Sequence, residues 1–180
     1  SFCNFSKIKP EIDMLKDNGV KEILPIASYS TLNETNRFSN PEYIKELLTK
    51  ETGKEIVDTI SKAEPIGPEN LVDLIIIAPC TGNTLAKLSL GISDTPVTMA
   101  AKSHLRNNNP LVIALSTNDG LSGNAENLGR LLNRKNCYFV PFRQDNPFTK
   151  PRSISFDDSF LIKTIELALE KEQIQPILIW

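Results

Sequence analysis

The sequence predicts an α/β fold, a three-layer α/β/α sandwich around a mostly parallel, Rossmann-like sheet. The first observation behind this prediction is a nearly unbroken Leu/Val/Ile run at 71–78, which does not alternate with polar residues. Such a run is typical of a strand buried on both faces of a parallel sheet. The second is that two further apolar runs, 111–115 and 137–142, follow it with helical segments between them. Strand–helix–strand alternation at this spacing indicates βαβ units.

The helices are predicted from apolar residues at helical spacing and from residues that begin or end helices. The first is expected from about residue 6 to 18 and ends before Gly19. A second opens at Pro41, where a proline is tolerated in the first turn, and ends near Gly53. Further helices are expected at 84–90, 96–107, 123–133 and 157–172, and shorter strands at 22–28 and 55–60.

The composition excludes several classes of protein. A length of 180 residues suits a single domain spanning the whole chain. With 40% hydrophobic and 23% charged residues, the chain is neither disordered nor collagen-like. A net charge of −2 argues against binding to nucleic acid or to an anionic membrane. The longest apolar run, 71–79, is about half a membrane span and contains Asp73.

The cysteines favour a reducing cytoplasm. Cys3, Cys80 and Cys137 are odd in number, widely spaced and without a C-x-x-C pair, so the sequence predicts neither a disulfide framework nor a metal site. The chain begins Ser-Phe-Cys, without an initiator Met, and enters directly on a predicted helix. We therefore expect the natural N-terminus to lie upstream.

Three polar loops follow predicted strands, and in an open α/β sheet ligands bind beyond the carboxyl ends of the strands. The loops are 28–35, 79–84 and 116–124, each rich in Ser, Thr and Asn. The second starts a helix and presents hydroxyls, an amide and free backbone N–H groups, which suit an anion or a polar cofactor. The alternative is that Thr81 or Asn83 only caps the helix, with Gly82 in the turn. Capping alone does not explain why three such loops lie at one edge of the sheet. Neither G-x-G-x-x-G nor G-x-x-x-x-G-K-S/T occurs.

The stretch APCTGNTLAKLSLGISDTPVTMAAK, from Ala78 to Lys102, resembles the flavoprotein superfamily of homo-oligomeric FMN-binding cysteine decarboxylases and flavin prenyltransferases. The pattern of that superfamily after its central strand is A-P-x-S/T-A/G-N-T-x-x-K-x-x-x-G-x-x-D. The resemblance continues through 63–68, 104–132, 135–154 and 173–178, nearly the whole chain. It implies FMN as the cofactor and a homo-oligomer, often built from trimers.

The resemblance also implies which residues hold FMN. The family has an N-terminal strand that ends in a Thr-Gly-Ser phosphate loop, and this chain is expected to start on the Ser of that loop, so that Ser1 and the following helix N-terminus hold the phosphate. The residues expected to line the rest of the cofactor are Pro79, Cys80, Thr81, Gly82, Asn83 and Thr84, with Ser28 or Ser30 from the second strand. Ser116, Thr117 and Asn118 fall where the decarboxylases carry P-A-M-N. Asn118 thus matches their substrate-facing Asn and is the residue expected to act in catalysis.

Three departures from the family pattern bear on the reaction. The decarboxylases carry a His about eight residues before the Asp that opens the central strand, whereas residues 64–66 here are Glu-Pro-Ile. The P-A-M-N motif keeps its Asn at Asn118 but loses its Pro and Met. The Tyr expected to help hold a prenyl phosphate is Thr149. These departures count against decarboxylation and against prenyl transfer.

Within the superfamily, the segments match best a branch that forms one component of a two-component synthase. Its reaction removes two hydrogens from a dihydropyridine dicarboxylate, or from its hydrated precursor, to give an aromatic ring, and a flavin suits that oxidation. The resemblance implies a nicotinamide-dependent dehydrogenase as the partner and the cytoplasm of the mother cell of a sporulating bacterium as the location. An FMN-dependent decarboxylase or prenyltransferase, and a non-catalytic protein that only stabilises its partner, remain as alternatives.

A substrate with two carboxylates calls for cationic or amide donors. The residues expected to bind it are Lys102, Arg106, Arg143 and Lys150, with Arg37 and Arg152 as further candidates; for each of these, a solvated surface charge is the alternative. The single histidine, His104, is expected to be an interface or surface residue rather than a base. Cys80 is expected to pack rather than to act as a nucleophile.

Overall fold

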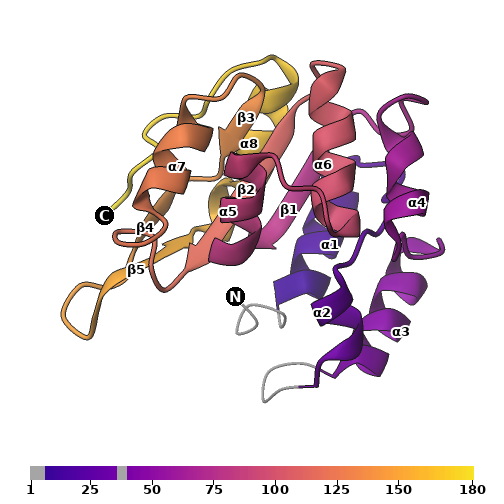
Figure 1. Ribbon diagram of the computed structural model, residues 1–180, viewed down its shortest axis with the longest axis horizontal. Coiled ribbons are helices and arrows are strands. Elements are labelled where there is room, and N and C mark those ends of the chain that lie inside the picture. The colour runs from indigo at the N-terminus through magenta and orange to yellow at the C-terminus, as the bar shows by residue number, and fades with distance from the viewer. Residues whose placement is uncertain (1–6, 36–39) are drawn as a thin grey trace.

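In the computed structural model, which describes residues 7–35 and 40–180, helices cover both faces of one sheet (Figure 1), and the three-layer α/β/α class is confirmed. The helices are α1 (Ile8–Asp17), α2 (Tyr29–Asn33), α3 (Pro41–Thr52), α4 (Ile60–Ala63), α5 (Gly82–Leu90), α6 (Pro96–Arg106), α7 (Ala125–Leu132) and α8 (Leu161–Leu169), with 3-10 turns η2 (Glu64–Ile66) and η3 (Asp158–Phe160). The strands are β1 (Ile75–Cys80), β2 (Leu111–Thr117), β3 (Cys137–Phe139), β4 (Phe142–Asn146) and β5 (Lys150–Phe156).

The sheet is mixed. β1 and β3 pair with β2 in parallel, and all seven residues of β2 are buried. Beyond this parallel part, the end of β2 pairs antiparallel with β5, through Ser116 and Ser155. β5 in turn pairs antiparallel with β4. The carboxyl end of β2 is therefore held by strands on both sides.

The β4–β5 hairpin was not predicted from the sequence, which indicated a single strand at 137–142. β3 ends at Phe139, and Pro141, which has no N–H group, separates it from β4. The hairpin turn is closed by Asn146, whose Oδ1 accepts hydrogen bonds from the backbone N–H groups of Phe148 (3.0 Å) and Thr149 (2.9 Å). Figure 1 shows the hairpin extending away from the helices.

The predicted strands at 22–28 and 55–60 are reduced to an isolated parallel bridge between Ile26 and Val57. Two backbone hydrogen bonds hold it, from Ala27 N to Val57 O (3.1 Å) and from Val57 N to Pro25 O (2.8 Å). The reason is that neither segment has a second neighbouring strand among the described residues. The residues after Ser28, predicted as a loop, form the short helix α2.

Side chains of β2 alternate between two cores. Leu111, Ile113 and Leu115 pack with residues of α5, α6 and α7 on one face of the sheet. Val112 and Ala114 pack on the other face with residues of α1 and α8. The non-alternating apolar pattern of the sequence is thus explained by burial on both faces.

The expectation that His104 is a surface or interface residue is wrong. Its side chain is fully buried on α6, and its Nε2 lies 3.2 Å from the carbonyl oxygen of Pro110, just before β2. Burial lowers the pKa of the imidazole, so the ring is held neutral. His104 therefore anchors the end of α6 to the start of β2.

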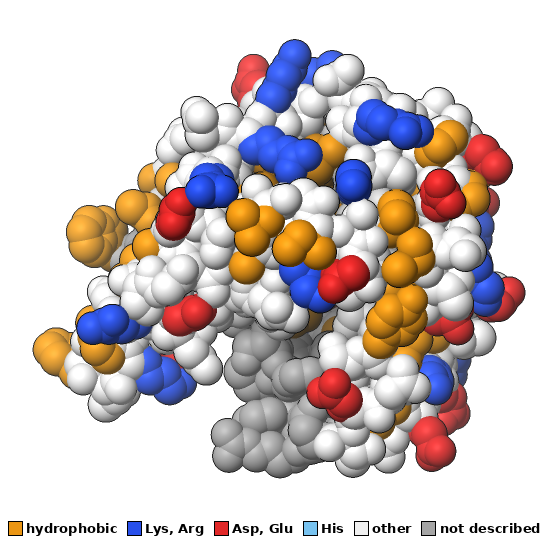
Figure 2. Space-filling view, in the orientation of Figure 1, with side chains coloured by type: hydrophobic (Ala, Val, Ile, Leu, Met, Phe, Trp, Pro, Cys, Tyr) orange, Lys and Arg blue, Asp and Glu red, His pale blue; other side chains and the backbone are white. Residues whose placement is uncertain are grey.

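The face of the molecule drawn in Figure 2 carries charges of both signs. In Figure 2, Lys/Arg and Asp/Glu side chains are interspersed over the face shown. Among residues 7–35 and 40–180, no helix has the length and apolar character needed to span a membrane.

Candidate functional site

Two of the three predicted polar loops meet in one large cleft. The cleft has a volume of about 1420 Å³ and lies between β1 with the start of α5 on one side and α1, α2 and α3 on the other. Ser28, Ser30, Pro79, Thr81, Asn83 and Thr84 all line it. Figure 1 shows the helices of the N-terminal part beside β1 at this place.

The N-terminus of α5 opens onto the cleft, which Thr81, Asn83 and Thr84 line. Thr81 is the N-cap: its Oγ1 accepts a hydrogen bond from Thr84 N (3.3 Å), and its carbonyl accepts one from Leu85 N (2.9 Å). The first N–H groups of a helix, here those of Gly82 and Asn83, have no partner within the helix. Together with the positive end of the helix dipole they favour a negatively charged or polar group.

A cluster of hydroxyls faces this helix end from α2. Ser28 caps α2 by accepting a hydrogen bond from Thr31 N (3.3 Å), and its hydroxyl lies 3.1 Å from that of Ser30 and 2.9 Å from that of Thr31. These groups can donate as well as accept. The rim of the cleft is therefore polar on both sides.

The third loop is held by a carboxylate that the sequence reasoning missed, Asp119. Its Oδ1 accepts from Thr117 Oγ1 (2.5 Å), and its two oxygens accept from Asn124 Nδ2 at 2.9 and 2.8 Å. Hydrogen bonds to the Thr117 hydroxyl and to Asn124 hold the pKa of Asp119 below its ordinary value. Asn124 also accepts from Asn127 Nδ2 at 2.9 Å. The signal in the sequence is an Asp two residues after the end of a strand, since Asp often bonds to neighbouring groups in turns.

This loop packs directly against the start of α5. A Cβ atom on Gly82 would lie 2.5 Å from Thr117 Oγ1, 2.6 Å from Asn124 Nδ2 and 2.9 Å from Asp119 Oδ1. Only a residue without a side chain allows this approach. The Asp119 network therefore fixes the helix end that opens onto the cleft.

Comparison with known proteins identifies the chain. Residues 27–142 match the sequence profile of the family described as Flavoprotein. The chain belongs to the flavoprotein family. It is 43% identical over 180 residues to the B subunit of dipicolinate synthase of Bacillus subtilis (strain 168), covering 99% of this chain and 89% of that protein.

Solved structures agree with this assignment. The crystal structure of the dipicolinate synthase B subunit from Bacillus halodurans C superposes on this flavoprotein with a TM-score of 0.89 and 40% identity, covering 100% of this chain and 92% of the other. DmrB of Burkholderia xenovorans, crystallised in complex with FMN, gives a TM-score of 0.64 at 16% identity, covering 92% and 90% of the two chains. At that identity the second likeness supports the fold alone.

The cleft of the flavoprotein fits FMN. Its rim supplies hydroxyls and an amide for the polar ribityl chain, and its walls include apolar side chains of Ile26 and Val97 for a ring. The volume exceeds the usual range for small-ligand pockets, about 300–1,000 Å³. The residues that would hold the cofactor are therefore the hydroxyls of α2 together with Pro79, Thr81, Asn83 and Thr84.

Four residues predicted to bind the flavin do not line the cleft. Cys80, Gly82, Ser116 and Thr117 are buried and are not among the residues that line the cleft. Burial raises the pKa of the Cys80 thiol to about 12, so the thiol stays protonated and suits the packing role expected for it. Ser1 lies outside the described residues.

Asn118 lies at a second, smaller depression of about 390 Å³, which is also lined by Lys150 and Arg152. At this depression a backbone hydrogen bond from Leu121 N to Arg152 O (3.0 Å) joins the loop after β2 to β5. Of the predicted substrate residues, Lys150 is thus near Asn118, although its Nζ also pairs with Asp145 Oδ2 at 2.6 Å.

The other predicted substrate residues are scattered over the flavoprotein. Arg143 on β4 pairs with Asp157 at 3.5 Å, and Lys102 donates to Ser93 Oγ at 3.3 Å. Arg106 is in the last turn of α6. It therefore lies near the amino end of β2, whereas Asn118 follows the carboxyl end of that strand. Arg37 lies outside the described residues.

The Asp119 network gives a first prediction. Asp119→Asn should lower the free energy of unfolding by about 1–2 kcal/mol, because one oxygen that accepts from Asn124 becomes an amide donor. The urea midpoint at unchanged m-value measures the loss. The matched control is Glu126→Gln, which removes a surface ion pair with Arg130 and one acidic charge from the first turn of α7, and it should change stability by less than about 1 kcal/mol. Equal midpoints for the two variants would contradict a positioning role for Asp119.

Proposed function

We propose that this flavoprotein is the FMN-binding B subunit of a dipicolinate synthase and contributes to the oxidation of dihydrodipicolinate, or its hydrated precursor, to dipicolinate. The observation that carries the proposal is the cleft in which the hydroxyls of α2 face the open N-terminus of α5. The two relatives from dipicolinate synthases support the choice of substrate.

In this proposal Asn118 and Lys150 orient the substrate through one of its carboxylates. An amide and an ammonium group at one depression can each donate a hydrogen bond to a carboxylate oxygen. Oxidation to the aromatic ring removes one hydride and releases one proton to water. FMN, when bound, supplies the acceptor for the hydride. The residues of the chain bind and orient, and the ordered Asp119 loop keeps Asn118 in place.

The proposal includes a partner and a location. The partner is the A subunit of dipicolinate synthase, which is a nicotinamide-dependent dehydrogenase, and the flavoprotein itself assembles as a trimer-based homo-oligomer. The setting is the cytoplasm of the mother cell during sporulation. Both relatives are named as one lettered component of a synthase, which supports the existence of another.

The test begins with the visible absorption spectrum of the purified natural protein. We expect a two-band yellow spectrum, release of FMN on denaturation, and rebinding of added FMN. Asn83→Ala, which removes an exposed amide from the rim, should weaken FMN binding about tenfold, the effect of losing about 1.4 kcal/mol. Asn133→Ala, an exposed amide at the end of α7, is the matched control and should bind FMN normally. A colourless protein that does not bind FMN would overturn the cofactor assignment.

Activity separates a catalytic role from one that only stabilises the partner. The flavoprotein and the partner dehydrogenase are assayed separately and together for oxidation of the dihydro-substrate. We expect Asn118→Ala to reduce the rate of the combined enzyme while the complex still forms. If the rate is unchanged and only complex formation depends on this chain, the non-catalytic alternative replaces the proposal.

A further inference from the structure

The smaller depression, of about 390 Å³, is built on an irregularity of β5. Gln144 of β4 pairs with Ile154, and two residues further along β4, Asn146 pairs with Lys150. The single residue of β4 between these pairs therefore lies opposite three residues of β5, 151–153. Such a bulge often re-aims a side chain next to a functional site. The bulged residues line the depression together with Lys150.

The bulge is fixed to the end of β2 and to the loop after it. Leu121 N donates to Arg152 O at 3.0 Å, and Ser153 Oγ donates to the carbonyl oxygen of the last residue of β2 at 3.3 Å. The loop also packs closely on β5, because a Cβ atom on Gly120 would overlap the side chain of Ile154. The backbone of Arg152 is thus held in place, whereas its side chain is exposed.

The guanidinium group of Arg152 is not used within the part of the chain that the structure describes. Across residues 7–35 and 40–180, no ion pair and no side-chain hydrogen bond involves it. The nearby acids have other partners, since Asp145 pairs with Lys150 at 2.6 Å and Asp157 pairs with Arg143 at 3.5 Å. A guanidinium presents a planar fork of N–H donors that fits a carboxylate through two parallel hydrogen bonds. Arg152 is therefore suited to a carboxylate of a ligand.

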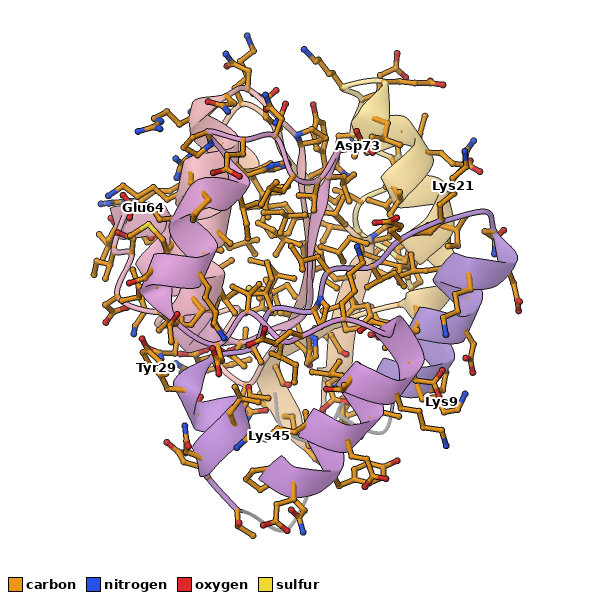
Figure 3. The ribbon with its side chains drawn as sticks, turned by 90° about the vertical axis from the view of Figure 1, so that its right-hand side faces the viewer. Lys9, Lys21, Tyr29, Lys45, Glu64 and Asp73 are labelled. Carbon is orange, nitrogen blue, oxygen red and sulfur yellow. The ribbon has the colours of Figure 1, made fainter. Side chains whose placement is uncertain are left out.

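The depression and the cleft lie at the same end of the sheet. β1 is the end strand, with one open side among the described residues, and it pairs in parallel with β2. Thr81 of the cleft follows β1, and Asn118 of the depression follows β2. In Figure 3, Asp73, which precedes β1, lies toward the upper end and Tyr29 of α2 lies lower, and Figure 1 shows the β4–β5 hairpin at the lower end too. A ligand in the depression is thus at the edge where the cleft opens.

We propose that the depression selects ligands with two carboxylates on one six-membered ring, and that Arg152 is the residue that selects them. The inference rests on the proposed function, in which Asn118 and Lys150 hold one carboxylate. Arg152 is two residues from Lys150, at most about 7 Å along the strand, so its long side chain can reach a second carboxylate on the same ring. The volume of about 390 Å³ is near the lower end of the range for ligand sites and suits a ligand with one ring.

The selection depends on what the Arg152 fork meets. A ring with a single carboxylate makes the contacts with Asn118 and Lys150 and leaves the fork in water. A ring with a second carboxylate adds a charge-assisted pair of hydrogen bonds, which corresponds to about a 10- to 100-fold gain in affinity. Arg152 therefore determines specificity, and the contacts common to both ligands come from the other two residues.

Titration calorimetry of the natural full-length protein with two ligands, in metal-free buffer, tests the proposal. The ligands are pyridine-2,6-dicarboxylate and pyridine-2-carboxylate, and we expect the first to bind at least about 10-fold more tightly. Arg152→Gln should bring the two affinities to within about twofold of each other while the affinity for the monocarboxylate stays unchanged, which also shows that the variant is folded. Lys150→Gln should weaken both ligands. Arg143→Gln, which removes a charge from the same hairpin, is the matched control and should keep the full preference.

Three results would overturn the proposal. The first is an original protein that does not bind the dicarboxylate or does not prefer it, and the second is a preference that Arg152→Gln leaves intact. The third comes from inorganic phosphate as a further probe: if phosphate binds as tightly as the dicarboxylate and Arg152→Gln weakens both equally, the depression is a general anion site.

The binding measurement is independent of the flavin spectrum and of turnover. A colourless protein that keeps the Arg152-dependent preference would contradict the cofactor assignment and support this inference. A yellow protein that oxidises the dihydro-substrate together with its partner, and whose preference does not depend on Arg152, would support the proposed function and overturn this inference. The two failures are therefore distinguished.

Discussion

Gly82→Ala should destabilise the protein by about 1–3 kcal/mol and disturb the start of α5. The added methyl group would meet three polar atoms of the Asp119 loop at 2.5–2.9 Å, and these atoms already bond to one another. Neither the helix nor the loop can move without breaking that network. The urea midpoint measures the stability, and if FMN is bound the visible spectrum should show weaker binding in the same variant.

Gly129→Ala is the matched control for this substitution. Gly129 is inside α7, and a Cβ added there would have no atom within 4 Å. Alanine is favoured over glycine in a helix interior by up to about 1 kcal/mol, so this variant should gain stability. A Gly82→Ala protein as stable as Gly129→Ala would show that α5 does not depend on close contact with the Asp119 loop.

The protein should lose stability as the pH rises from about 4.5 to 7, and Glu11→Gln should abolish this loss. Burial raises the pKa of Glu11 from 4.5 to about 7 in the folded chain. The folded state therefore holds the proton more tightly than the unfolded state, and this group favours folding fully below pH 4.5 and progressively less up to pH 7. At pH 8 the variant should be more stable than the original by up to about 3 kcal/mol, whereas at pH 4 the two should be equal.

Urea unfolding at several pH values measures this difference. Glu46→Gln, an exposed position on α3, is the control and should leave the pH dependence unchanged. A constant difference between Glu11→Gln and the original chain from pH 4 to pH 8 would contradict a buried carboxyl with a raised pKa.

The layers and the central strands could be predicted from the sequence, because they depend on local patterns. Continuous apolar runs placed β1 and β2, and Gly19, Pro41 and Gly53 placed the end of α1 and both ends of α3. The hairpin of β4 and β5 could not be predicted in this way. Its strands are mostly exposed and polar, and they are ordered by pairing with each other and with the end of β2. Such pairing between distant segments does not produce a periodic pattern of apolar residues in the sequence.

The position of the site could be predicted from the sequence better than the roles of its residues. Polar loops after buried strands led to Ser28, Thr81 and Asn83, which do share one cleft. Burial could not be read from residue type, so Cys80 and Thr117 were grouped with residues that line the rim. Asp119 was missed because its importance lies in its contacts with Asn124 and with the close approach of Gly82, which appear only in three dimensions.

The open side of β1 also matters before the protein is complete. A strand with bare backbone groups and apolar flanks is a template on which another chain can assemble. At the opposite edge, β4 carries polar and charged side chains and bridges Leu178 through Phe142, whereas β1 has no such cover among the described residues. We expect self-assembly through this edge to compete with correct folding during synthesis. We therefore expect the yield of soluble protein to be higher when this edge of β1 is covered.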